Sequence, residues 1–347
     1  MQIERPDLSQ VDPLVRAYIE ALETALQDIQ TSADRSAPTT AQIPLAPDEP
    51  PTTLNVITLT PAGSGKRTPR HQYSRQRRGG MGIFDLQTSD KATPAVLTIA
   101  DATQSLLLFT NLARAFRVPV KALPESPIHS RGVDITVRLG WQEGEQLVAA
   151  LPDLARGSLA LLSERGLVRC LRHHVFGEYM KPGIVLFDTR QFGQLSACCW
   201  TPGDGDLFIA TRQGRAIRFA EKLVPPSGGP GIKLEGDDKA VAVAPVYSDS
   251  GVCLLSADGR GTIRDMQGFN PNKSTGGSGK IAMSTSALVA AATVQEKDDL
   301  FVISRLSKII RFMAAEVPVK EGVVQGVACI SLRADETVAL VVSRSAS

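Results

Sequence analysis

The chain has 347 residues, with 38 basic and 36 acidic side chains, and only 5% of its residues are aromatic although 43% are hydrophobic. Its first thirty residues lack the basic-then-apolar order of a secretory signal, and no segment approaches the roughly 18 uninterrupted apolar residues of a membrane-spanning helix. Five cysteines, an odd number without metal spacing, fit buried thiols in a reducing compartment, so we expect a soluble cytoplasmic protein and neither a secreted nor a membrane protein.

The first predicted element is an amphipathic helix over residues 13–31, within an N-terminal segment 1–31. Asp12 is placed to cap this helix, and Pro13 fits its first turn. Apolar side chains then alternate at spacings of 4 and 3 residues, as on the a and d positions of a coiled coil: Val15, Ile19, Leu22, Leu26 and Ile29. Because a helix of about 20 residues is marginal alone, we expect this face to pair with itself, dock on the rest of the chain or recruit a partner.

A linker is predicted over residues 32–53, which are rich in Pro, Thr and Ala and have little to bury. Residues 1–53 carry 3 basic and 9 acidic side chains, a net charge of −6, which leaves +8 for residues 54–347. The body of the protein is therefore its basic part.

From residue 54 onward the sequence repeats itself every 46 to 53 residues. Each repeat has an apolar run, a Thr or Ser, a turn on Gly or another small residue, and a second apolar run that ends on an arginine. This order predicts a β-hairpin, because glycine supplies the positive φ of a tight turn. Ala113 and Ser307 replace the glycine in two repeats, so those turns should be of another type or strained. The repeats begin at Leu54, Leu106, Leu159, Leu207, Cys253 and Leu300.

A second signature follows each hairpin after about 14 to 20 residues: a glycine near a basic or polar residue, then another short apolar strand. Two hairpins in each repeat predict four-stranded blades, and six repeats predict an all-β, six-bladed ring over residues 54–347. A closed ring also removes the exposed sheet edges of an open array. Local pattern does not say whether neighbouring blades exchange strands.

Residues 54–82 form the most basic stretch, with six basic side chains and no acidic one. Such a concentration of charge is typical of a surface that binds a polyanion. The stretch contains Gln76-Arg77-Arg78-Gly79-Gly80-Met81-Gly82.

That heptapeptide resembles the QRRGGKG box of the C-terminal DNA-wrapping domain of the DNA gyrase A and topoisomerase IV A subunits, with Met81 in place of the lysine. The resemblance extends to Thr58–Thr68 and to Leu107–Glu125, in the same order as in the family. It implies a β-pinwheel, a propeller-like disc whose blades exchange a strand and whose basic rim bends duplex DNA.

The resemblance, together with the position of one arginine at the same strand end of every repeat, predicts the DNA-binding residues. If those strand ends face the rim, their arginines form a track for phosphates, with sequence-tolerant and salt-sensitive affinity. We expect the glycines of the box to make its loop pliable. The predicted set is Lys66, Arg67, Arg70, Arg75, Gln76, Arg77, Arg78, Gly79, Gly80, Gly82, Arg117, Arg131, Arg169, Arg172, Lys181, Arg218, Arg264, Lys280 and Arg311.

Two other patterns predict no site. His173 and His174 have no further metal ligands at short spacing. Lys66 follows a Gly-Ser-Gly sequence, but the first glycine of a phosphate-binding loop is missing. We therefore expect no metal and no cofactor.

The four tyrosines, Tyr18, Tyr73, Tyr179 and Tyr247, lie in the predicted helix or blades and not in a DNA-cleavage module, so we expect no enzymatic activity. Two hypotheses follow. The first is a non-catalytic protein that wraps double-stranded DNA, alone or in trans with a gyrase or topoisomerase IV core. The alternative is a protein-interaction scaffold that uses the disc and the N-terminal helix. Acidic stretches at 235–238 and 298–299 favour DNA contact mainly by the first two or three blades.

Overall fold

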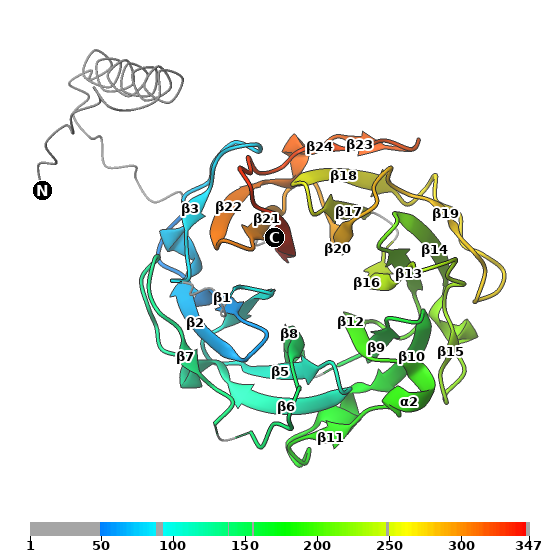
Figure 1. Cartoon of the computed structure of the whole chain (residues 1–347), viewed down its shortest axis with the longest axis horizontal. Helices are drawn as coiled ribbons and strands as arrows, with labels where there is room; N and C mark the ends of the chain where they lie inside the picture. The colour runs from blue at the N-terminus through cyan, green and yellow to red at the C-terminus, as the bar shows by residue number, and fades with distance from the viewer. Residues whose placement is uncertain (1–48, 88–92, 138, 155, 248–249, 345–347) are drawn as a thin grey trace, which may run out of the picture. The chain divides into compact units, whose positions relative to one another are not determined.

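The computed structural model describes residues 49–87, 93–137, 139–154, 156–247 and 250–344. The predicted helix at 13–31 and most of the predicted linker lie outside these residues. Within the described residues, β-sheets of four strands, one of them extended by a fifth, follow one another around a ring (Figure 1). The prediction of an all-β, six-bladed body is confirmed.

Each blade consists of an inner strand next to the ring axis, a central hairpin and a short outer strand of two residues. From the axis outward, blade 1 is β4 (Val96–Asp101), β1 (Leu54–Leu59), β2 (Ser64–Pro69) and β7 (Val133–Asp134). Blade 2 is β8 (Leu147–Pro152), β5 (Ser105–Thr110), β6 (Arg114–Pro119) and β11 (Ile184–Val185). Blade 3 is β12 (Leu195–Thr201), β9 (Ser158–Ser163), β10 (Leu167–Arg172) and β15 (Gly229–Pro230).

The other three blades repeat this order. Blade 4 is β16 (Ala240–Val246), β13 (Asp206–Thr211), β14 (Arg215–Ala220) and β19 (Lys280–Ile281). Blade 5 is β20 (Leu288–Val294), β17 (Gly251–Ser256), β18 (Arg260–Asp265) and β23 (Val319–Lys320), with β24 (Val327–Ala328) also paired to β18. Blade 6 is β25 (Thr337–Ser343), β21 (Asp299–Ser304), β22 (Lys308–Met313) and β3 (Ile83–Phe84).

Helical structure among the described residues is short. One α-helical turn, α2 (Thr189–Phe192), is capped by the side chain of Asp188. Single 3-10 turns follow the central hairpin in five repeats: Arg70–Gln72, Val120–Ala122, His173–Phe176, Glu221–Leu223 and Ala314–Glu316. No helix in the described part of the chain is long and apolar enough to cross a membrane.

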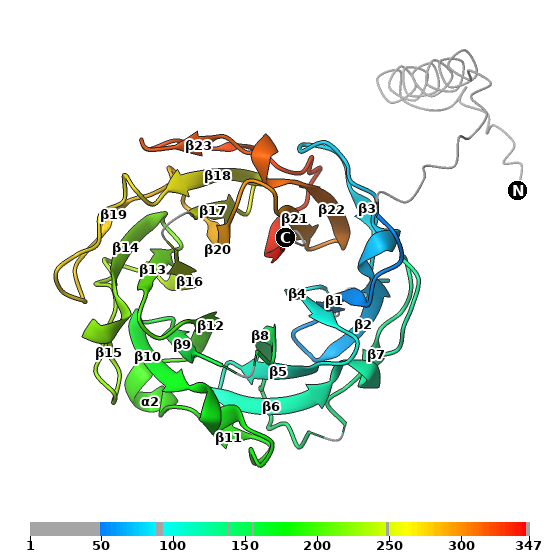
Figure 2. The same ribbon diagram turned by 180° about the vertical axis from the view of Figure 1, so that it is seen from behind.

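The outer strand of every blade comes from the next repeat along the chain. After β6 of blade 2, for example, the chain returns to pair β7 with β2 of blade 1, with Gly65 opposite Val133. The exchange also closes the ring: β3 of the first repeat pairs with β22 of the last, with Ile83 opposite Ile309 (Figure 2). We call the stretches that run from one blade to the edge of the previous one crossing segments. They comprise 70–84, 120–134, 173–185, 221–233, 266–281 and 314–328.

The hairpin turns that lack glycine keep the conformation of those that have it. Ala113 has a φ of 55° and Ser307 a φ of 67°, close to the 80° of Gly63. The same hydrogen bond closes each turn, as from the amide of Ala113 to the carbonyl of Thr110 (2.9 Å). These two turns are therefore strained and not of another type.

Apolar side chains of adjacent blades pack against each other and form the core. Leu107 and Phe109 of blade 2, for example, share one cluster with Leu159 and Leu161 of blade 3. The six inner strands surround an axial channel lined mainly by Ala, Val and Leu. The surfaces left for a large ligand are the two faces of the disc and its rim.

Candidate nucleic-acid interface

The strand-end arginines do not face the rim. Each sends its guanidinium to a backbone carbonyl, and in five of the six that carbonyl lies in the next repeat around the ring. Arg67 Nε donates to Leu123 O (3.0 Å), Arg218 Nη1 to Met266 O (2.6 Å) and Arg311 Nη1 to Tyr73 O (2.9 Å). Arg117 donates to Phe176 O and Arg264 to Gly322 O, whereas Arg169 donates to Leu186 O (2.7 Å) in its own repeat.

Carboxylates also neutralise four of these arginines. Nitrogen-to-oxygen distances are 2.6 Å for Arg67–Glu125, 2.7 Å for Arg117–Asp153, 2.8 Å for Arg218–Asp206 and 2.6 Å for Arg311–Asp299. Arg264 and Arg311 are buried, and the other four are half-buried. The expected phosphate track of strand-end arginines is therefore wrong in its geometry: these side chains tie neighbouring blades together.

Most of the basic stretch in the first repeat is also committed internally. Lys66 is buried, and its ammonium lies 2.9 Å from Asp85. Burial lowers the pKa of Lys66, and the charge of Asp85 partly offsets this effect. Arg70 pairs with Glu49 (2.9 Å) and Arg75 with Asp299 (2.9 Å). Lys66 is thus excluded from phosphate contact, and Arg70 and Arg75 would have to leave carboxylates to make one.

The box heptapeptide is the crossing segment that closes the ring. The amide of Gln76 donates to Arg311 O on blade 6 (2.8 Å), and the amide of Gly79 donates to Cys329 O beyond β24 (2.8 Å). Gly82 has a φ of 68°, and a Cβ on it would lie 2.8 Å from Ile309 O. Gly82 therefore allows the close approach of two backbones, whereas the expected pliability of the loop stays a prediction.

The two arginines of the box differ in their surroundings. Arg77 is exposed, and no ion pair or hydrogen bond of its guanidinium is seen among the described residues. Arg78 is half-buried and donates through Nη1 to Ala328 O (3.3 Å), while its amide donates to Glu316. Met81 is 65% exposed, so a lysine at this position would also face solvent.

Each crossing segment carries exposed basic side chains, and others, such as Arg165 and Arg212, lie on hairpin turns. Arg131, Arg172, Lys181 and Lys280 of the predicted set are exposed, at or next to an outer strand or the end of a central strand. Lys280 also lies over the ring of Phe269, 4.1 Å from its centroid. One exposed cation from each crossing segment gives a series that we call the rim cations: Arg77, Arg131, Lys181, Lys233, Lys280 and Lys320.

The chain is similar to known proteins in sequence and in fold. The family model "DNA gyrase C-terminal domain, beta-propeller" matches residues 54–92, 104–140 and 205–246. The DNA gyrase A protein of Ureaplasma parvum serovar 3 is 26% identical over 294 residues, which cover 82% of this chain and 35% of that protein. The DNA gyrase A protein of Neisseria gonorrhoeae is 28% identical over 337 residues, which cover 81% of this chain and 37% of that protein.

Two solved structures share the fold. The DNA gyrase A C-terminal domain superposes with a TM-score of 0.73 at 19% identity, covering 83% of this chain and 98% of that domain. The C-terminal domain of DNA topoisomerase IV superposes with a TM-score of 0.60 at 18% identity, covering 83% of this chain and 93% of that domain. The ring has the same fold as these two C-terminal domains, and we call it the gyrase-type ring. The chain spans about a third of the length of the gyrase A proteins it matches.

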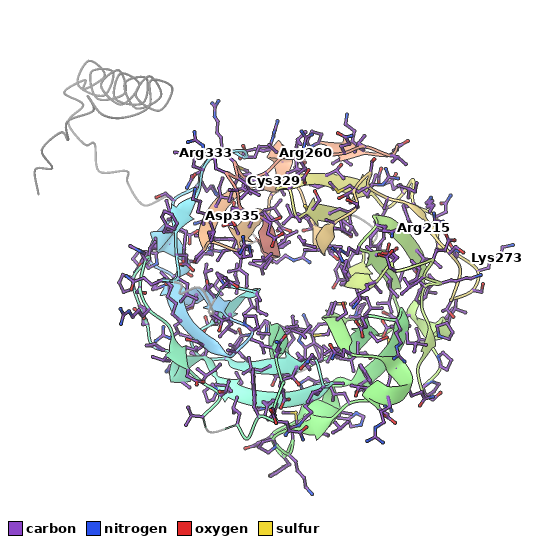
Figure 3. All side chains as sticks on the ribbon, viewed as in Figure 1. Arg215, Arg260, Lys273, Cys329, Arg333 and Asp335 are labelled. Atoms are coloured by element: carbon purple, nitrogen blue, oxygen red, sulfur yellow. The ribbon has the colours of Figure 1, made fainter. Side chains whose placement is uncertain are left out.

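Two arginines of this gyrase-type ring that the sequence did not indicate lie beside the box. Figure 3 shows Arg260 and Arg333 on either side of Cys329, where blades 5 and 6 meet. Arg260 is opposite Ala328 in the sheet, and Arg78 hydrogen-bonds to the carbonyl of that same residue. The box crosses from the first repeat, so only the closed ring brings these arginines together.

Lys233 and Lys320 are two further rim cations that were not among the predicted DNA-binding residues. Lys233 is part of the glycine signature that marks a crossing segment, so this signature could have indicated it.

The two acidic stretches differ in exposure: residues 298–299 are buried, whereas Glu235 and Asp237 of the stretch 235–238 are exposed. Asp298 and Asp299 are buried, and Asp299 holds Arg311 and Arg75. Asp238 is buried and accepts the amide of Gln213 (3.0 Å). Exposed cations follow the crossing segments onto all six blades, and stronger DNA contact by the first two or three blades stays a prediction.

Proposed function

We propose that this gyrase-type ring binds double-stranded DNA with little regard to sequence and bends it around its rim. The observation that carries the proposal is the series of rim cations, one from each crossing segment. Cations spaced around a convex edge neutralise phosphates along a curved path, whereas they offer no bidentate pattern for reading base edges. Several phosphate contacts together offset the cost of bending, about 1 to 6 kcal/mol for a site of 20 to 30 base pairs.

In this proposal the described ring makes and breaks no bond in DNA. Its buried acid and base groups, such as Asp85 with Lys66, are occupied in ion pairs that hold blades together. A wrapped duplex becomes a substrate for a strand-passing enzyme, so a gyrase or topoisomerase IV core is the partner that the similarity to gyrase A proteins suggests. The relatives are bacterial proteins, and we place this chain in the bacterial cytoplasm with its DNA.

The salt dependence of DNA binding tests the rim assignment. Changing Arg131, Lys181 and Lys233 together to glutamine should reduce the slope of log affinity against log salt by about 0.9 for each lost phosphate contact, or by roughly 2.7 in all. Fluorescence anisotropy with one labelled duplex at a series of salt concentrations measures this slope.

A charge-matched control separates local contacts from net charge. Arg165, Arg212 and Lys297 are exposed but lie on hairpin turns and loops outside the crossing segments. Changing these three to glutamine should leave the slope within experimental error of the parent. An equal decrease in both triple variants would refute the rim assignment, and no DNA binding by the parent at low salt would favour the scaffold hypothesis.

A further inference from the structure

The outer strands of the ring expose apolar side chains as well as cations. Five of the six outer strands carry at least one large apolar residue that is between 37% and 63% exposed. Only β15 (Gly229–Pro230) has none. The residues are Ile83 and Phe84 on β3, Val133 on β7, Val185 on β11, Ile281 on β19 and Val319 on β23.

These side chains contribute little to the core, although the ring of Phe84 lies against His129 and Lys308. They lie on strands of two residues at the open edge of each sheet, outside the apolar clusters between blades. Proteins usually protect such edges with charged residues or proline, because bare apolar edges promote association. A repeated series of exposed β-branched residues at this position therefore points to a ligand that covers them.

The neighbouring charges indicate what that ligand is. Ile281 directly follows Lys280, Val319 directly precedes Lys320, and Val133 comes two residues after Arg131. A lipid or an apolar protein face would bury these cations at a cost, since it offers no countercharge. Duplex DNA offers both surfaces side by side: phosphates on its backbone, and the apolar faces of deoxyribose that line the minor groove. Where DNA curves toward a protein surface, as around the histone octamer, its minor groove faces the protein about every 10 base pairs and side chains contact it there.

We propose that the exposed apolar residues of the outer strands contact the minor-groove side of the wrapped duplex and fix its curvature, while the adjacent cations hold its phosphates. This inference rests on the proposed DNA binding. It assigns affinity mainly to the cations and bending mainly to the apolar residues, so the two functions can be separated by mutation.

The experiment uses the full chain with Val133, Val185, Ile281 and Val319 all changed to threonine. Threonine keeps the β-branch that suits a strand and replaces one methyl group of valine, or the ethyl group of isoleucine, by a hydroxyl. We expect the salt slope of binding to equal that of the parent, because no charge is lost, and the bend of a short duplex to fall to half or less. Energy transfer between dyes on the two duplex ends measures the bend.

A control variant changes two comparably exposed apolar residues outside the outer strands. Leu154 lies at the mouth of the axial channel and Leu306 in the turn between β21 and β22. Leu154→Thr with Leu306→Thr should bend DNA as the parent does. Circular dichroism melting of all variants excludes unfolding as the cause of a lost bend.

The possible outcomes separate this inference from the function on which it rests. A quadruple variant that bends DNA as strongly as the parent overturns the inference and leaves DNA binding intact. An equal loss of bending in the control also overturns it. A parent that neither binds nor bends DNA at low salt overturns the proposed function itself.

Discussion

Asp85 is the residue that joins the two ends of the ring most directly. It follows β3 and is fully buried, with its backbone amide bonded to Ser307 O of blade 6 (2.9 Å). Its carboxylate accepts hydrogen bonds from Thr58 (2.6 Å) and Tyr73 (2.6 Å) of the first repeat and pairs with Lys66. Burial, followed by the charge of Asp85, raises the pKa of Tyr73 well above 10, so the phenol stays a donor.

Removing this carboxylate should therefore destabilise the whole ring. Asp85→Asn leaves the ammonium of Lys66 buried without its counterion, and the loss of one partner of such a pair costs about 3–5 kcal/mol. Urea unfolding followed by circular dichroism measures the change. The double variant with Lys66→Met removes the stranded charge and should recover part of the loss. A single variant as stable as the parent would contradict this role of Asp85.

Glu49 predicts a pH-dependent contribution to stability. Burial alone would raise the pKa of this carboxyl, but hydrogen bonds and charge from Arg311 and Arg70 outweigh burial and lower it below 4.5. A pKa that is depressed in the folded state means that the stabilisation is complete above about pH 4.5 and is lost as the pH falls through the folded-state pKa. The contribution is expected to be about 1.5–3 kcal/mol, as for hydrogen bonds to charged groups.

Comparing Glu49→Gln with the parent isolates this contribution. The difference in melting temperature should be constant from about pH 7 to about pH 5 and should shrink toward about pH 3, where the parent carboxyl also becomes protonated. A difference that is independent of pH over this range would show that the Glu49 charge contributes nothing.

At the scale of elements, the hairpins could be predicted from sequence and the crossing segments could not be fully predicted. A hairpin is local: the turn at Gly63 and its two strands lie within 16 residues, Leu54–Pro69. The partner of Arg67 lies 56 residues away, and that of Arg264 lies 58 residues away. The same basic residue at a strand end suits a solvent-facing track or an inter-blade tie, and only the three-dimensional neighbour decides between them.

The box shows the same limit. Its glycines predict an unusual backbone conformation. They do not tell whether glycine is needed there for conformational freedom of the loop or for close approach of two backbones. Gly82→Ala tests close approach, with Gly140→Ala as the matched control. Both positions have positive φ, 68° and 63°, but a Cβ at Gly140 meets nothing within 4 Å. The free energy of unfolding of the control should fall by about 1–2 kcal/mol, because alanine is strained in the left-handed conformation.

Gly82→Ala should lose clearly more free energy of unfolding than the control, because the new Cβ also collides with Ile309 O and disturbs the pairing of β3 with β22. Equilibrium unfolding in urea provides the comparison. Equal losses of stability in the two variants would show that close approach at Gly82 costs nothing and would favour the pliable-loop interpretation.

At the scale of the whole molecule, the number of blades was visible in the sequence because the repeats are regular in length. The blade that receives each outer strand could not be predicted from the sequence. Two residues such as Val133 and Asp134 pair equally well with their own blade or with the previous one. The exchange has a functional consequence. It brings a cation from one repeat to the edge of another, and it places Arg77 and Arg78 of the first repeat beside blades 5 and 6.

The central claim, that DNA is wrapped around this rim, is tested most directly by the linking number of DNA. Nicked plasmid is incubated with the full chain at low and at physiological salt, sealed with ligase, freed of protein and resolved by gel electrophoresis. The account predicts a shift of the linking-number distribution that grows with protein concentration and weakens with salt, positive in sign if the wrap is right-handed. A distribution identical to that without protein, at low salt and saturating protein, would contradict it.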